Sequence, residues 1–365
     1  MRPTVMKINM DTLMGNARLL REAVGRDTKM LCVVKADAYG HGAVPFAKRL
    51  EAEGLADAFA VAIVEEAAAL RGAGIRSMIV ILGGACEESL REAVRADASQ
   101  AVYTAEALRV LQDEAVKLGR DAKAHLKVDS GMSRIGVRTE EELRALLDAW
   151  KECPNVRMEG CFTHFCVADT DPAFTKAQDD VFSRMLEIIH EAGYTPIAHA
   201  AASTAMLNKA YHHDMVRAGI ALYGSCMPGI DVRNAQTLST RPIRIETIPA
   251  GGTVGYGRTW TARRDTRVMT IPIGYGDGYP RILSNRADVL VHGMRAPIVG
   301  RVCMDMLMAD ITDIPDVELT DEVVLMGTQG NETISPDELA EKAETIPYEI
   351  MLGFLPRIPM EITEE

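Results

Sequence analysis

The feature that most constrains the fold is an alternation of short apolar runs with helical patterns between about residues 10 and 225. Eight runs have the length and apolar content of strands: 30–35, 58–63, 78–82, 100–103, 123–128, 158–163, 196–199 and 215–218. Stretches with apolar residues at helical spacing separate them, such as 65–72, 87–94, 105–118, 140–150 and 174–192. Eight strand-helix units in roughly 200 residues predict an α/β fold, a TIM-like (β/α)8 barrel whose active site lies at the C-terminal ends of its strands.

The pattern changes near residue 230, where Pro228, Gly229 and Asp231 interrupt it. Five later segments are typical of strands with turn residues between them: 241–248, 267–273, 287–292, 296–299 and 322–326. We therefore expect two domains, a barrel over residues 1–232 and a C-terminal, mainly β domain over residues 233–365.

The charge balance favours a small-molecule partner. Forty basic and 52 acidic residues give a net charge of −12, whereas nucleic acids and anionic membranes are bound through positive patches. The first residues carry charge and proline where a secretory signal has an apolar stretch, and no apolar run approaches the length of about 20 residues that spans a membrane. We expect a cytoplasmic protein that binds neither nucleic acid nor membrane.

Seven cysteines without any Cys-x-x-Cys pair are typical of neither a disulfide framework nor a structural zinc site. We expect most of them to be buried apolar side chains. No metal site is predicted.

Lys35 ends the first apolar run and precedes a loop, 36–42, that contains two glycines, a tyrosine and a histidine. There its amine would lie at the mouth of the barrel, where partial desolvation lowers the pKa and frees the nucleophilic form. The plain alternative is a lysine whose stem crosses the rim and whose head reaches water. Position alone favours that alternative.

The segment 33–42 resembles the cofactor-lysine motif of the alanine racemases. Six further segments resemble patterns of the same family in the same order: 127–136, 162–165, 217–224, 254–260, 274–279 and 300–305. The resemblance spans nearly the whole chain. It implies an isomerase that depends on pyridoxal 5'-phosphate, interconverts L-alanine and D-alanine by two-base proton transfer, and acts as a homodimer with shared active sites.

Through this resemblance Lys35 matches the Schiff-base lysine, and Tyr256 matches the second base, which the family supplies from the second domain of the other subunit. Racemisation removes a proton from one face of Cα and delivers one to the other, which suits two opposed bases. A phenol with a pKa of about 10 needs help to act as a base near neutrality. In the family a histidine backed by the cofactor arginine gives that help, and the matches are His164 and Arg217.

Arg217 also matches the residue that faces the pyridine nitrogen, where a guanidinium acts only as a donor. A ring without its own proton there is a poorer electron sink, so we expect racemisation to prevail over transamination. The resemblance implies further cofactor contacts from six residues: Tyr39, His164, Ser203, Gly219, Ile220 and Tyr348.

For the substrate carboxylate, the resemblance implies Arg134 of the barrel together with Met304 and Asp305 from the partner subunit. Lys127 matches a position that is often carbamylated in relatives, and an ordinary ion pair of this lysine is the alternative. The implied substrate entry is framed by these residues: Tyr275, Tyr348, Arg281, Arg301, Ile346 and Asp169. Its tyrosines would leave room for little beyond a methyl group at Cβ, which favours alanine and leaves serine as a side activity.

Two positions depart from the family pattern: Ala202 stands where asparagine is common, and Gly276 stands where alanine is common. The main alternatives are a broader racemase of small amino acids or serine, a non-catalytic barrel that binds pyridoxal phosphate, a decarboxylase with a related barrel, and a barrel without cofactor. A non-catalytic carrier would normally lack the second domain and a residue like Tyr256. A decarboxylase generally has a different C-terminal signature.

Overall fold

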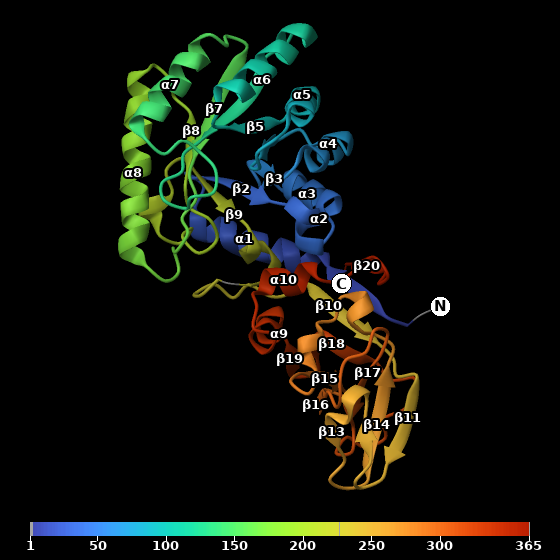
Figure 1. The fold of residues 1–365 in the computed structure, drawn as a ribbon. Coiled ribbons are helices and arrows are strands. Elements are labelled where there is room, and N and C mark those ends of the chain that lie inside the picture. Colours follow the sequence, from blue (N-terminus) through green and yellow to red (C-terminus); the bar gives the residue numbers. More distant parts are fainter. Residues whose placement is uncertain (1–2, 226, 365) are drawn as a thin grey trace. The chain divides into compact units, whose positions relative to one another are not determined.

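The computed structural model describes residues 3–225 and 227–364. The chain divides into two compact units (Figure 1). One runs from Met14 to Val232, and the other contains the residues up to Leu13 together with those from Arg233 onward.

The first unit is a barrel of eight parallel strands. They pair in the order β8-β7-β6-β5-β4-β3-β2-β9, and their bounds are β2 (Lys29–Val33), β3 (Ala58–Val61), β4 (Met78–Ile81), β5 (Ser99–Val102), β6 (Ala122–Lys127), β7 (Val156–Phe162), β8 (Ile197–His199) and β9 (Met215–Ala218). The amide of Arg217 donates to the carbonyl of Ala201 over 2.9 Å and nearly closes the ring between β8 and β9. Each predicted run overlaps one of these strands, which confirms the (β/α)8 barrel.

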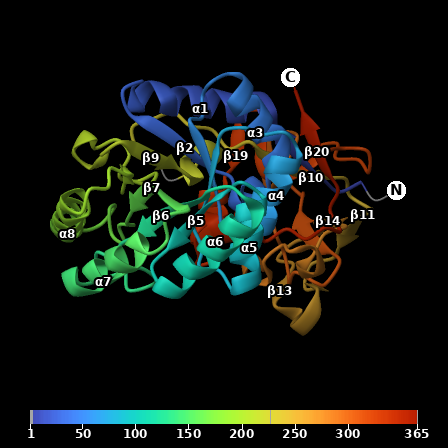
Figure 2. The same cartoon turned by 90° about the horizontal axis from the view of Figure 1, so that it is seen from above.

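Helices lie around the outside of these strands (Figure 2). They are α1 (Met10–Val24), α3 (Ala43–Ala52), α4 (Val64–Gly72), α5 (Glu87–Arg95), α6 (Ala105–Leu118), α7 (Glu140–Lys151) and α8 (Pro172–Glu191). α7 begins with a capping box, since the Thr139 hydroxyl accepts from the amide of Glu142 over 3.1 Å and the Glu142 carboxylate accepts from the amide of Thr139 over 3.4 Å. The side chains of β3 and β5 are all buried, as expected for parallel strands covered on both faces.

The second unit is built mainly from antiparallel sheets. Its largest sheet has the order β16-β15-β18-β10-β1-β20, with β19 paired to β18, and a second sheet has the order β11-β14-β17. The bounds are β1 (Val5–Asn9), β10 (Gln236–Thr240), β11 (Arg244–Ile248), β12 (Thr253–Val254), β13 (Trp260–Thr261), β14 (Thr266–Ile271), β15 (Asp288–Val291), β16 (Met294–Pro297), β17 (Leu307–Asp310), β18 (Val323–Gln329), β19 (Glu332–Ile334) and β20 (Met360–Thr363). The prediction of a mainly β C-terminal part is confirmed.

Short helices complete both units. The second unit contains α9 (Pro336–Lys342), α10 (Pro347–Leu352) and the single turns η3 (Tyr256–Arg258), η4 (Tyr275–Asp277) and η5 (Arg281–Leu283). The barrel unit adds α2 (Lys35–Gly40), η1 (Lys209–Tyr211) and η2 (Ile220–Tyr223).

The N-terminal strand belongs to the second unit, whereas the sequence-based division assigned it to the barrel. β1 pairs antiparallel with β10 and parallel with β20, for example Met6 with Leu238 and with Met360. These pairings satisfy the backbone of β1 on both sides and group the residues up to Leu13 with the C-terminal part of the chain.

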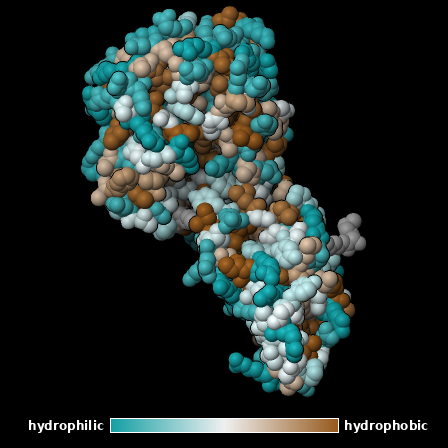
Figure 3. Space-filling model, in the orientation of Figure 1, coloured by the Kyte–Doolittle hydropathy of each residue, from teal (hydrophilic) through white to brown (hydrophobic). Residues whose placement is uncertain are grey.

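In the space-filling view, apolar side chains are scattered among polar ones on the visible face of the barrel unit (Figure 3). Among the residues described, no helix combines the length and the apolar character needed to cross a membrane. The six cysteines described, which exclude Cys226, are free thiols.

Candidate active site

Lys35 begins a left-handed turn at the C-terminal end of β2. Within α2, four consecutive residues have φ between 50° and 55°: Ala36, Asp37, Ala38 and Tyr39. L-amino acids in this region cost roughly 1–2 kcal/mol each. The surrounding structure must therefore hold the turn in place.

Two carboxylates hold this turn. Glu66, in the first turn of α4, accepts from the amide of Ala36 with one oxygen and from the amide of Ala62 over 2.7 Å with the other. Asp37 Oδ1 accepts from the amide of Ala43 over 2.7 Å at the start of α3. The backbone that follows the candidate Schiff-base lysine is thus tied to two outer helices.

The turn brings Tyr39 to a buried group of hydroxyls and amides. Ser203, which is 4% exposed, accepts from the amides of Gly219 over 3.0 Å and Ala221 over 3.3 Å. A methyl group built on Gly219 would lie 3.5 Å from both Ser203 Oγ and Tyr39 Oη. This space, beside the buried Ile220, is lined by neutral donors of the kind that hold phosphate oxygens.

Arg217, on β9, is a buried cation whose hydrogen bonds go to neutral acceptors. Nη1 donates to Nδ1 and to the carbonyl of His199, over 3.0 and 2.9 Å. Nη2 donates to the carbonyls of Thr163 and Ala200, over 2.8 and 2.7 Å, and to Nδ1 of His164 over 3.1 Å. Burial and the charge of Arg134 lower the pKa of Arg217 to about 9. The site therefore favours a ligand that brings negative charge.

The arginine fixes the tautomers of its histidine neighbours, because a guanidinium has no acceptor. His199 and His164 must each accept at Nδ1 and carry their proton on Nε2. His199 Nε2 lies 2.9 Å from Nδ1 of His125, so this bond runs from His199 to His125. Burial, followed by the positive charge of Arg217, lowers the pKa of both His125 and His164 to about 3.

Two lysines lie near the positive charges of Arg134 and Arg217. Burial lowers the pKa of Lys35, Arg134 lowers it further, and Glu66 acts in the opposite direction. Burial and then Arg217 lower the pKa of Lys127 to about 8. Lys127 is 3% exposed on β6, and its amine donates to the carbonyl of Val128. Both amines are thereby shifted toward their neutral, nucleophilic forms.

Arg134 lies exposed on the loop after β6, and this loop has a defined shape. Asp129 accepts from the amides of Gly131 and Ser133, over 3.1 and 2.9 Å, and from Nε of Arg138 over 3.1 Å. At its far end Gly136 has φ +121°, and a Cβ there would lie 2.6 Å from the amide nitrogen of Asp129. The loop closes on itself only with glycine at position 136.

The other predicted residues lie in the second unit. Tyr256, 70% exposed in η3, lines a hollow together with Met304 and Asp305. Tyr275, in η4, donates its amide to the carbonyl of Cys303 over 3.0 Å, which brings its loop against the loop of Met304. A Cβ on Gly257 would lie 3.4 Å from Cζ of Arg301, so the side chain of Arg301 lies beside η3.

The structure therefore brings the predicted residues together in two groups. The barrel group contains Lys35, Tyr39, Lys127, Arg134, His164, Ser203, Arg217, Gly219 and Ile220. In the second unit, Tyr256, Tyr275, Arg301, Met304 and Asp305 gather around the loops just described. Asp169 lies exposed between β7 and α8, Arg281 begins η5, and Ile346 and Tyr348 lie at the start of α10.

Sequence reasoning assigned no role to His125, His199, Glu66 or Arg357. A signal existed for His125, because it lies two residues before Lys127 on one strand and alternation puts both on the same face. Glu66 and Arg357 act on residues 30 and 52 positions away, respectively, and nothing local marks them.

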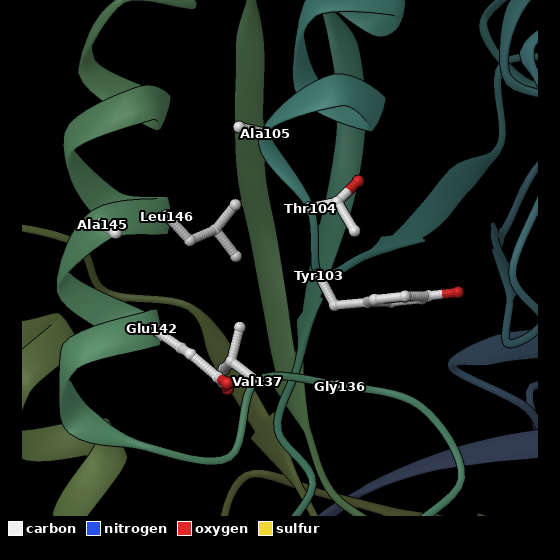
Figure 4. Close-up of a pocket in the computed structure, with 8 residues that line it drawn as sticks. All are labelled: Tyr103, Thr104, Ala105, Gly136, Val137, Glu142, Ala145 and Leu146. Atoms are coloured by element: carbon white, nitrogen blue, oxygen red, sulfur yellow. The ribbon is translucent and has the colours of Figure 1, made fainter.

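A hollow elsewhere in the barrel unit lacks these features. Tyr103 and Thr104 lie on one side of it, and Leu146 and Glu142 of α7 lie on the other (Figure 4). The carboxylate of Glu142 already accepts from the amides of Arg138 and Thr139, just before α7. This hollow offers no basic group to an anionic ligand.

Known family models match both parts of the chain. Residues 8–227 match the N-terminal domain of alanine racemase, and residues 235–362 match its C-terminal domain. Among curated relatives, an alanine racemase of Halothermothrix orenii is 41% identical over 99% of this chain and 97% of its own length. Alanine racemase 1 of Caldanaerobacter subterraneus subsp. tengcongensis is 38% identical over 98% of this chain and 94% of its own length.

Solved structures agree with these matches. An alanine racemase of Clostridium difficile 630 is 33% identical, covers 100% of this chain and 97% of its own, and superposes with a TM-score of 0.93. An alanine racemase of Bacillus anthracis with bound L-Ala-P is 34% identical, covers 100% of this chain and 96% of its own, and has a TM-score of 0.90.

A barrel with this basic interior, followed by a mainly β unit, defines the protein as an amino-acid racemase, an isomerase. The chain belongs to the alanine racemase family. The comparisons do not favour the decarboxylase or the non-catalytic barrel, since both domain models are those of the racemase.

Proposed function

We propose that the chain interconverts L-alanine and D-alanine with pyridoxal 5'-phosphate held in the barrel. The observation that carries the proposal is a cluster of basic side chains in the barrel: Lys35, Lys127, Arg134 and Arg217. The positive charge of the arginines lowers the pKa values of their basic neighbours, and the Lys127 amine donates only to a neutral carbonyl, so the cluster has a surplus of positive charge. Pyridoxal phosphate brings a phosphate and a phenolic oxygen, and alanine brings a carboxylate. Each supplies negative charge to this cluster.

The residues fit the cofactor. The Tyr39 and Ser203 hydroxyls and the amides near Gly219 and Ile220 suit the phosphate, and Lys35 is the Schiff-base lysine. Arg217 would face the pyridine nitrogen as a donor, with His164 and Tyr348 as further contacts. When bound, the cofactor withdraws electrons from the substrate and acidifies the hydrogen on Cα.

Two groups of the protein exchange the Cα proton in this proposal. Lys35, whose pKa is lowered, holds or takes the proton on one face. Tyr256 acts on the other face and comes from the second unit of a partner subunit. Its side chain is 70% exposed in a single chain, which supports a role at a partner's site. His164 carries its proton on Nε2 and is able to donate to the phenolic oxygen, which favours the basic form of Tyr256.

We place the substrate carboxylate near Arg134 and near Met304 and Asp305 of the partner. The entry is framed by Tyr275, Arg281, Arg301, Ile346 and Asp169. A narrow entry favours the methyl side chain of alanine. Because a pocket discriminates by only about 1–3 kcal/mol per methylene, slow turnover of serine is expected.

We also propose that Lys127 is carbamylated. Its pKa of about 8 leaves a neutral fraction of the amine near neutral pH. The lone pair of Nζ attacks the carbon of CO2, a C–N bond forms, one C=O π bond breaks with its electron pair moving to oxygen, and one proton leaves the nitrogen for the solvent. The resulting anion would offset part of the positive charge of Arg134 and Arg217. Carbon-13 NMR of protein equilibrated with labelled bicarbonate tests this, with Lys127→Ala as the control that must lack the signal.

Reduction of the purified, cofactor-loaded protein with sodium borohydride tests cofactor attachment. The yellow colour should disappear, and mass spectrometry should find the added mass on the peptide of Lys35, not on that of Lys127. Lys29, exposed at the other end of β2, supplies the control variant Lys29→Ala, which should keep the colour. A colourless protein that takes up no added cofactor contradicts the proposal. Incubation with L-alanine in D2O should give Cα exchange and D-alanine.

Mixed subunits test the shared site. Lys35→Ala and Tyr256→Phe proteins should each be nearly inactive. Random mixing of equal amounts should restore roughly a quarter of wild-type activity, because half of the dimers are mixed and each has one complete site. If Lys35 and Tyr256 act within one chain, mixing restores nothing.

A further inference from the structure

We propose that Arg357 is a positioning residue for the substrate carboxylate, acting through Asp305, and that Gly276 makes room for it. This inference rests on the proposed function. All the residues concerned lie in the second unit.

Arg357 binds three groups with its guanidinium. Nη2 donates to Oδ1 of Asp305 over 2.8 Å, and Nη1 donates to the carbonyl of Gly276 over 3.1 Å. Nε lies 3.4 Å from Oδ1 of Asp277, whose side chain is fully buried. The side chains of Arg357 and Asp305 are about half exposed, at 50% and 49%. One planar donor group thus joins the η4 loop to the Met304–Asp305 loop.

Backbone hydrogen bonds already align these two loops. The amide of Gly276 donates to the carbonyl of Met304 over 2.8 Å, and the amide of Tyr275 donates to the carbonyl of Cys303 over 3.0 Å. The segment of Arg357 is tied to the same place by the amide of Leu355, which donates to the carbonyl of Asp277 over 3.0 Å. The backbone is thus aligned without Arg357. The main effect of Arg357 is therefore to orient the Asp305 side chain and to neutralise its charge.

Gly276 is needed for space and not for backbone conformation, since its φ is not in the left-handed region. A Cβ there would lie 2.7 Å from Nη1 of Arg357, 3.0 Å from the carbonyl oxygen of Met304 and 3.1 Å from Cγ of Met304. An alanine would push the guanidinium away from Asp305. This gives a physical meaning to the glycine noted above as a departure from the family pattern.

Neutralisation matters because Asp305 is proposed to lie near the carboxylate of the amino acid. An unpaired carboxylate there would repel the substrate, whereas one paired with Arg357 would not. Loss of Arg357 should therefore raise KM far more than it lowers kcat. The proton transfers depend on other residues, Lys35 and Tyr256.

The experiment compares three single and two double variants of the cofactor-loaded enzyme. Arg357→Gln should raise KM for alanine about 10-fold, with less at high salt, and change kcat by less than about threefold. Asp305→Asn alone should change KM little, and the double variant should return KM toward that of Asp305→Asn. Gly276→Ala should raise KM in the same direction and add nothing to Arg357→Gln. The inhibition constant of propionate, a carboxylate without an amine, should rise in parallel with KM.

The matched control is Arg264→Gln, which breaks an exposed arginine–aspartate pair with Asp313 in the same unit and should leave both constants unchanged. An unchanged KM in Arg357→Gln, or a defect that Asp305→Asn does not relieve, overturns the inference while alanine turnover by the wild type stands. A wild type that fails to racemise alanine overturns the proposed function instead.

Discussion

Nη2 of Arg217 donates to Nδ1 of His164 over 3.1 Å, so His164 carries its proton on Nε2. Burial, Arg217 and Arg134 together lower the pKa of His164 to about 3. The imidazole is therefore neutral throughout the range in which such an enzyme is assayed. It is a fixed donor and not a titrating base.

The first prediction concerns the pH profile. In the wild type, kcat/KM should show no ionisation from His164 between pH 5.5 and 8. Burial is the largest cause of the low pKa of His164 and remains in Arg217→Gln, whereas the charge of Arg217, the next cause, is removed. The pKa of His164 should therefore rise but stay below its ordinary value of 6.5, and the acidic limb of the profile should move to higher pH than in the wild type. Activity should also fall at least about 100-fold. An unchanged profile in Arg217→Gln would show that Arg217 does not control this histidine.

Arg217→Glu tests the outcome of the reaction. A carboxylate facing the pyridine nitrogen would favour its protonation and make the ring a stronger electron sink, so more substrate should be diverted to transamination. Pyruvate formed from alanine, followed with lactate dehydrogenase, measures this side reaction. Arg217→Gln, which adds no acid, is the control. A pyruvate yield per turnover equal in both variants would contradict the role given to Arg217.

The sequence predicted the barrel because each of its strands is marked by a local apolar pattern. Residues 30–35 and 215–218 are recognisable as apolar runs whatever strand they pair with, and β2 and β9 overlap them. β1 and β20 were missed because only their pairing with each other and with β10 makes them part of a sheet. The left-handed turn after Lys35 was also missed, since its conformation depends on Glu66, a residue 30 positions away.

For the site, motif resemblance identified residues that the fold brings together, such as Ser203 and Gly219. It did not identify the partners that hold them. His125 and Arg357 belong to no motif, and their contacts join residues 74 and 52 positions apart in the chain. Such contacts follow from tertiary packing and have no local pattern.

Buried histidines should make the barrel sensitive to acid. Burial lowers the pKa of His41 to about 4, those of His125 and His164 to about 3, and that of His199 as well. The unfolded chain takes up these protons below about pH 6.5, whereas the folded chain does not. The free energy of unfolding is therefore highest above pH 6.5 and decreases as the pH falls toward 4, by at most about 1.4 kcal/mol per pH unit for each histidine.

Urea unfolding of the protein at several pH values, with and without cofactor, measures this loss. His125→Leu should reduce the dependence on pH between 6.5 and 4 by about one proton. The exposed His190 on α8 offers the control variant His190→Gln, which should keep the wild-type slope. A His125→Leu slope equal to that of the wild type would mean that His125 is protonated in the folded barrel.

The last prediction concerns the loop that carries Arg134. Gly136 has φ +121°, and an added methyl group would lie 2.6 Å from the amide nitrogen of Asp129 and 2.9 Å from the carbonyl oxygen of Lys127. These contacts are with backbone, so no side-chain rotation relieves them. Gly136→Ala should therefore lower the free energy of unfolding by about 2–4 kcal/mol, and it should raise KM for alanine by moving Arg134.

Gly193→Ala is the matched control, because Gly193 also has positive φ, +90°, but has no atom within 4 Å of an added Cβ. It should cost only the conformational strain, about 1 kcal/mol, and leave KM unchanged. Thermal unfolding and steady-state kinetics on both variants separate the two effects. If Gly136→Ala loses stability but keeps the wild-type KM, the loop does not position Arg134 for the substrate, and the carboxylate must be bound by other groups.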